Sequence, residues 1–160
     1  MRSTPRSERN TQDIDLIMAV PSIAKMPEIR LSSQDMYFAR GLFGELQIDI
    51  LLTRNPLFDQ VARKYNTLKR FLDQDIRCAA VEGLILLKLF ALPSLDRQES
   101  FERVGIYESD LGSLIYAFDP NMETLLKELQ AYLNKTDLAE DRLIVKDIQA
   151  RIQKFRKASE

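Results

Sequence analysis

The sequence predicts a protein with both helices and strands, of the α/β class in the broad sense and more closely α+β. Strands and short helices come first in the chain, and helices follow. Residues 1–78 contain short apolar runs, partly alternating with polar residues and separated by proline, glycine and serine. From residue 79 onward the apolar residues recur at helical spacing. At 160 residues and 45% hydrophobic content, the chain is large enough for one core. We therefore expect a strand-containing core at 1–78 and a helical part at 79–160, packed together as one domain.

The elements of the first half follow from these local patterns. Pro21 ends an apolar strand, Gly41 and Gly44 supply a hairpin turn, and Pro56 suits the first turn of a helix. The predicted order is a strand at 13–20, a short helical turn and loop at 21–34, antiparallel strands near 35–40 and 46–53, a helix at 56–65 and a strand at 67–72.

The second half is predicted to be helical. An apolar helix covers 79–92 and is buried except at Glu82 and Lys88, and a charged loop leads from Pro93 to a helix around 107–117. Two amphipathic helices follow, at 120–135 and 136–160. Their predicted buried residues are Met122, Leu125, Leu126 and Leu129 in the first, and Leu143, Ile144, Ile148, Ile152 and Phe155 in the second.

The composition restricts the chemistry. The chain has no histidine and one cysteine, Cys78, which excludes an internal disulfide and a histidine base, so a metal would need carboxylate ligands. The net charge of −1 gives no overall attraction to nucleic acid or to anionic membranes. No apolar stretch approaches the roughly 18 residues of a membrane span, and the first residues contain no hydrophobic signal core. We expect a cytoplasmic protein that does not contact a membrane.

Three aspartates are the candidate metal ligands. Asp13 and Asp15 lie two residues apart in a predicted strand and therefore project to one side, and Asp49 interrupts the apolar strand "LQIDILL". If these strands are neighbours, the three carboxylates can hold Mg²⁺, which prefers oxygen ligands. The alternatives are an ordinary acidic pair on an exposed strand and, for Asp49, an edge-strand charge that opposes aggregation.

The segment "RNTQDIDL" resembles the R-x-T-x-D-I-D-L segment of the nucleotidyltransferase-like superfamily related to DNA polymerase beta. The likeness is greatest to the branch with abortive-infection and type IV toxin–antitoxin toxins, and it covers roughly residues 9–117. "IDILL" is similar to the strand that carries that family's third aspartate, and "LILLKLFAL" to a helix that carries a lysine, here Lys88. "YESDLGSLI" matches part of a further helix motif and places Asp110 at its second acidic position.

The resemblance implies a mixed β-sheet core flanked by helices and transfer of a nucleoside monophosphate to an RNA or protein acceptor. Asp13, Asp15 and Asp49 would be the catalytic residues and the ligands of two Mg²⁺ ions, or of Mn²⁺. Arg9, Thr11 and Lys88 would bind the nucleoside triphosphate, and Asp110 would support Lys88. A lysine whose ammonium group snorkels to solvent, or an internal ion pair between Lys88 and Asp110, is an equally good explanation of that residue. A toxin-like function would bring an antitoxin-like protein partner.

The sequence departs from the family at one important place. The family carries a Gly-Gly or Gly-Ser turn before the first aspartate, whereas none of the twelve residues before Asp13 is glycine. Either the natural chain starts further upstream, or this chain keeps the carboxylates and has a damaged phosphate site. We therefore carry two functions forward: an enzyme, and a catalytically degenerate fold that acts as a protein-interaction module. Apolar sheet surface uncovered by the missing element would favour a homo-oligomer.

Overall fold

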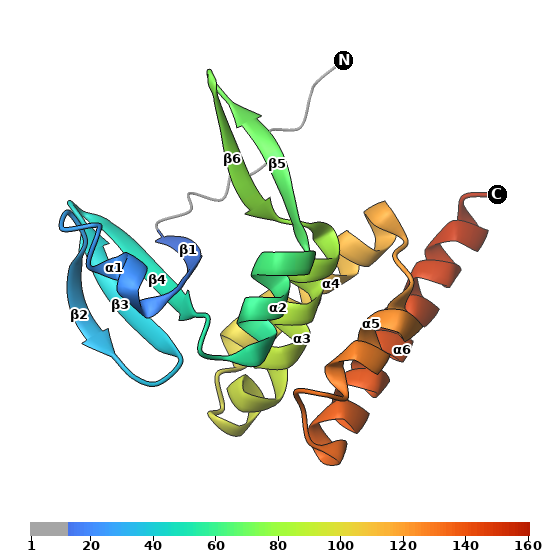
Figure 1. The fold of residues 1–160 in the computed structure, drawn as a ribbon. Coiled ribbons are helices and arrows are strands. Elements are labelled where there is room, and N and C mark those ends of the chain that lie inside the picture. Colours follow the sequence, from blue (N-terminus) through green and yellow to red (C-terminus); the bar gives the residue numbers. More distant parts are fainter. Residues whose placement is uncertain (1–12) are drawn as a thin grey trace. The chain divides into compact units, whose positions relative to one another are not determined.

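A computed structural model describes residues 13–160 of the chain (Figure 1). The described residues form a mixed sheet, a small two-stranded sheet and several helices, so the predicted α+β class is confirmed. The chain divides into two compact units, one that ends at Asp59 and one that begins at Gln60. The change in composition that the sequence shows at residue 78 therefore falls inside the second unit.

The first unit contains a four-stranded mixed sheet in the order β1-β4-β3-β2. Strand β1 pairs with β4 in parallel, and the pairs β4–β3 and β3–β2 are antiparallel. The elements of this unit are β1 (Asp13–Met18), α1 (Val20–Ile23), β2 (Arg30–Gln34), β3 (Phe38–Phe43) and β4 (Leu46–Leu52).

A two-residue turn at Gly44 and Glu45 joins β3 to β4. Gly44 has a φ of +61°, which glycine adopts without a steric penalty at the first central position of such a turn. Gly41, predicted to be in the turn, lies inside β3. A Cβ atom there would come within 2.7 Å of the Arg30 carbonyl oxygen, so glycine allows β3 and β2 to approach closely.

One face of this sheet is covered and makes the core of the first unit. Successive strand residues point to opposite faces, and the buried side chains of β4 are Ile48, Ile50 and Leu52. Ile23 of α1 and Ile29 of the following loop pack against them. The residues that alternate with this buried set, including Asp49, point to the other face.

The second unit is mainly helical (Figure 1). The division between the units falls within α2 (Pro56–Lys64). Helix α3 contacts α4, α5 and α6, and it also contacts β6. The remaining elements are β5 (Asn66–Phe71), β6 (Gln74–Ala79), α3 (Val81–Arg97), α4 (Phe101–Phe118), α5 (Met122–Leu129) and α6 (Lys135–Ala158).

Several predicted elements need correction. Residues 30–34 and 74–79 are strands that the sequence did not predict, and both are mostly exposed, so they carry little hydrophobic pattern. The predicted charged loop is wrong, because α3 continues to Arg97 and α4 already begins at Phe101. Pro93 removes one backbone donor from α3, but burial of Leu92 and Leu95 on either side offsets that loss.

The buried stripe of α6 also differs from the prediction. Leu143 and Phe155 are 68% and 70% exposed. The apolar residues buried on this helix are Leu138, Val145 and Ile148, and Asp141 is buried at the remaining position of that stripe. An acidic residue at a core position conceals the true helical register, because pattern reading follows the apolar residues.

Two glycine substitutions should have opposite effects on stability. A Cβ atom at Gly83 of α3 would lie 2.8 Å from the Tyr65 carbonyl oxygen and 3.0 Å from a methyl group of Val61. We expect Gly83→Ala to lower the free energy of unfolding by about 1–3 kcal/mol because a backbone atom must move. A Cβ atom at Gly112 of α4 meets no atom within 4 Å. Gly112→Ala should therefore raise stability by roughly 0.5–1 kcal/mol through helix propensity. Urea unfolding measures both, and equal effects would contradict the close packing at Gly83.

Candidate functional site

The parallel pair of strands brings two of the predicted site residues together. Asp15 of β1 and Asp49 of β4 are Cα partners in the register, and Asp13 is opposite Gln47. Neighbouring strands lie about 4.8 Å apart, so the Asp15 and Asp49 backbones are adjacent. The condition for a shared site, that the strand of Asp49 lies beside the strand of Asp15, is therefore met.

Both residues alternate with the buried residues of their strands and so belong to the open face of the sheet. Leu16 and Met18 of β1 pack on the core together with Ile48 and Ile50 of β4. Asp15 is exposed, and the side chain of Asp49 is 22% exposed. The two carboxylates therefore share a face that a solute can reach.

Asp49 has two hydrogen-bonding neighbours that the sequence reading missed. Arg40 Nε, on the adjacent strand β3, donates to Asp49 Oδ1 at 2.7 Å. The amide nitrogen of Gln47 lies 3.4 Å from Oδ1 and 3.3 Å from Oδ2. A cation that binds Asp49 must compete with the guanidinium of Arg40, which is itself 53% exposed.

A signal for Arg40 exists in the sequence. In a hairpin with a two-residue turn the register is fixed by the turn. If the turn consists of Gly44 and Glu45, residue 43 is opposite residue 46. Three residues further from the turn, residue 40 is then opposite residue 49. The prediction that Gly41 and Gly44 together supply the turn concealed this pairing.

The remaining predicted ligands of this unit can be placed only in part. Asp13 is the first residue of β1, and the structure describes its backbone but not its side chain. Arg9 and Thr11 lie outside the described residues altogether. Within the part of the chain that the structure describes, no three histidine, cysteine, aspartate or glutamate side chains are grouped closely enough to hold a metal ion. The three-carboxylate site thus stays a prediction.

Lys88 and Asp110 belong to the helical unit and form an ion pair. Lys88 Nζ of α3 is 3.0 Å from Asp110 Oδ2 of α4, with about a quarter of each side chain exposed. The same ammonium group lies 4.5 Å from the centre of the Tyr107 ring, which adds a cation–π contact. Of the roles that the sequence left open for Lys88, the ion pair is present in the structure, and a phosphate contact stays a prediction.

A comparison with protein-family models gives no match, and no curated protein matches the sequence. Residues 13–160 contain no helix that is both long enough and apolar enough to span a bilayer.

Proposed function

We propose that the protein is a Mg²⁺-dependent nucleotidyltransferase that transfers a nucleoside monophosphate from a nucleoside triphosphate to an RNA or protein acceptor. The observation that carries this proposal is the register of Asp15 and Asp49 on adjacent parallel strands. The ordered resemblance of the motifs around Asp13, Asp49 and Lys88 gives the reaction class.

The donor set on this face fits the metal. Carboxylate oxygens are the ligands that Mg²⁺ and Mn²⁺ prefer. Asp15 and Asp49 would supply two of them, and the two-residue period of a strand gives Asp13 as the third. The conflicting feature is Arg40, whose guanidinium occupies Asp49 Oδ1.

The roles of the residues follow from this arrangement. Asp13, Asp15 and Asp49 would hold Mg²⁺, which would supply positive charge near the triphosphate and favour ionisation of the acceptor hydroxyl. The hydroxyl oxygen forms a bond to the α-phosphorus, the bond to pyrophosphate breaks, and the hydroxyl proton passes to Asp49. Arg40, which is half-exposed, would have to release Asp49 before a metal ion could bind there, and its planar guanidinium would then be available to a phosphate oxygen.

The ion pair itself favours a second candidate function. An arginine 2.7 Å from the central carboxylate neutralises the charge that a metal needs. In that case the fold is catalytically degenerate and acts as a protein-interaction module. The two candidates differ in a direct way, because only the enzyme requires Asp49 to exchange Arg40 for a metal ion.

Metal binding should stabilise the folded protein. A ligand at ten times its dissociation constant adds about 1.4 kcal/mol to the free energy of unfolding, which raises the thermal midpoint by a few degrees. We expect this shift with millimolar Mg²⁺ or Mn²⁺ in the parent protein and its loss in the double variant Asp13→Asn, Asp15→Asn. Differential scanning fluorimetry with and without the ion measures it.

Glu45→Gln is the matched control, because it removes one exposed carboxylate from the turn of the same sheet. This variant should keep the full shift. A shift of equal size in the double aspartate variant would place the ion elsewhere, and the absence of any shift in the parent would favour the interaction module.

A further inference from the structure

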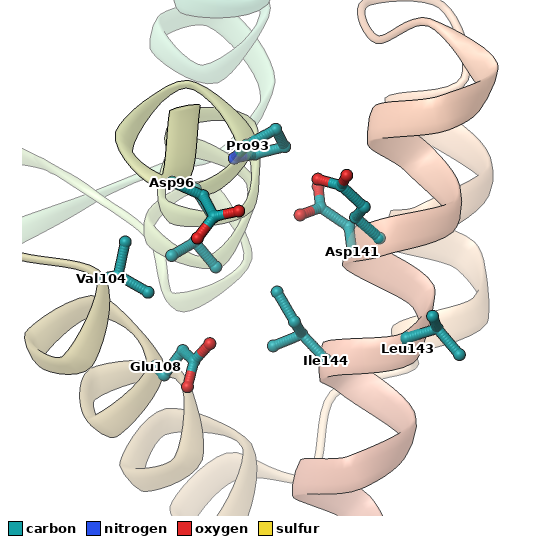
Figure 2. A pocket seen from close by; sticks show the side chains of 9 residues that line it. Pro93, Asp96, Val104, Glu108, Asp141, Leu143 and Ile144 are labelled. Atoms are coloured by element: carbon teal, nitrogen blue, oxygen red, sulfur yellow. The ribbon is translucent and has the colours of Figure 1, made fainter. Parts of the chain in front are cut away.

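A pocket in the helical unit is bordered by α3, α4 and α6 (Figure 2). Its volume is about 340 Å³, at the lower end of the range for small-molecule sites. Among the described residues, the side chains that line this pocket are either apolar or acidic, and none of them is a lysine or an arginine. The apolar residues are Leu92, Pro93, Val104, Leu143 and Ile144, and the acidic ones are Asp96, Glu108, Glu140 and Asp141.

Asp141 is the unusual member of this lining. It is 0% exposed, and neither carboxylate oxygen has a hydrogen-bond partner among the described residues. Figure 2 shows its side chain extending from α6 toward Pro93 and Asp96 of α3. A buried carboxyl group without a partner is costly, and a ligand that donates hydrogen bonds to it would offset that cost.

Asp137, one helical turn earlier, provides the contrast. It is also buried, but Arg97 donates to its Oδ1 at 2.8 Å and Asn134 donates to its Oδ2 at 3.1 Å. Its backbone N–H in turn donates to the Asn134 side chain at the start of α6. The described residues thus satisfy one buried aspartate of α6 fully and give the neighbouring one no hydrogen-bond donor, which leaves its carboxyl group available to a ligand.

The lining indicates the chemistry of that molecule. Four acidic side chains and no basic one select a cation. A metal ion is a poor fit, because the described carboxylates do not gather three together around one point. A planar guanidinium binds a carboxylate with two hydrogen bonds, and an aliphatic stem suits the walls formed by Pro93, Val104 and Ile144.

We propose that this pocket, here named the α3–α4–α6 pocket, binds a small organic cation whose guanidinium or ammonium group contacts Asp141 while its aliphatic stem lies against the apolar wall. Glu108, which is half-buried, and the exposed Asp96 and Glu140 attract the cation at the opening. Asp141 at the buried end supplies the directional contact. This site lies within the helical unit and does not depend on the proposed nucleotidyltransferase function.

The protonation of Asp141 gives the site a pH dependence. Burial, followed by the charges of Asp137 and Glu140, raises the pKa of Asp141 to about 8. The other charged groups around it are Asp96 of α3, Glu108 of α4 and Arg97, which is held by Asp137. A guanidinium keeps its charge throughout this range. Binding should therefore release a proton below pH 8 and become tighter as the pH rises from 6 to 8, by up to about tenfold per unit.

Isothermal titration of the full chain with butylguanidine tests the proposal. Butylurea has nearly the same shape and no charge, so it serves as the ligand control. We expect butylguanidine to bind with a roughly millimolar dissociation constant at pH 8.5, and butylurea not to bind. Asp141→Asn should weaken binding at least tenfold and remove its pH dependence. Asp147→Asn, which neutralises an exposed carboxylate on the same helix, should leave binding unchanged.

The design keeps the possible outcomes apart. The thermal midpoint of Asp141→Asn shows that the variant is folded, and Glu108→Gln is a second variant at the same pocket, expected to weaken binding severalfold. Equal binding of butylurea, unchanged affinity in both pocket variants, or no binding of butylguanidine to the parent would each overturn the proposal. A loss of affinity in the Asp147→Asn control would equally overturn it, because the attraction would then be general to the acidic surface.

Discussion

Asp141→Asn is expected to make the folded protein more stable at pH 8 than the parent, by an amount on the order of a few kcal/mol. The cause is linkage between folding and ionisation. In the unfolded chain the Asp141 carboxyl group ionises at its ordinary pKa of 3.8, whereas in the folded protein its pKa is about 8. Raising the pH between these values ionises the unfolded state alone, and this lowers the stability of the parent relative to the variant.

The pH window of this effect is defined by the same two values. Below pH 3.8 the carboxyl group is protonated in both the folded and the unfolded state, so ionisation takes no stability from the parent. The free energies of unfolding of the parent and Asp141→Asn should therefore differ little at this pH. Between pH 4 and 8 the parent should lose about 1.4 kcal/mol per pH unit relative to Asp141→Asn. Urea unfolding of both proteins from pH 3.5 to 8.5 measures the difference. Asp147→Asn should show no such slope, and parallel curves for the parent and Asp141→Asn would contradict the buried, partnerless state of Asp141.

Nucleotide transfer should depend strongly on Asp49. Loss of this carboxylate removes a metal ligand and the acceptor of the hydroxyl proton, and each role alone is worth on the order of 100-fold. We expect Asp49→Asn to reduce transfer from a labelled nucleoside triphosphate to RNA or protein by at least about 100-fold, in Mg²⁺ or Mn²⁺. The measurement is label retained in acid-precipitated RNA and protein after incubation with each of the four nucleotides.

Glu45→Gln is again the matched control, and Arg40→Gln adds a second comparison. If Arg40 only neutralises Asp49, the Arg40→Gln variant should transfer nucleotide at least as fast as the parent. If it binds a phosphate after leaving Asp49, the variant should be slower. Transfer by Asp49→Asn at the rate of the parent would disprove the role assigned to this carboxylate.

The elements that the sequence predicted well are those with a strong apolar pattern. The strands with Asp15 and Asp49 were expected because each runs through consecutive buried or half-buried apolar residues. Their adjacency could be stated only as a condition, because no local pattern reports which strands pair. The exposed strands β2 and β6 were missed for the opposite reason, since few of their side chains are buried.

The candidate sites show the same limit. Asp49 was found because a charge in an apolar strand is conspicuous, but its partner Arg40 depends on the hairpin register. Asp141 was missed because only apolar residues were assigned to the buried stripe of its helix. Its spacing from Leu138 and Val145 would have placed it on the buried stripe, provided that Leu143 was not assigned to that stripe first.

The most direct test of the proposed function is the site of Mn²⁺ binding, observed as paramagnetic broadening of backbone amide resonances. Mn²⁺ added in small amounts should broaden the amides around Asp15 and Asp49 on β1 and β4 first, and the effect should disappear in the variant Asp15→Asn, Asp49→Asn. Broadening that is confined to the helical unit, for example around Glu108 and Glu140, or that persists in the double variant, would contradict a metal site on the sheet.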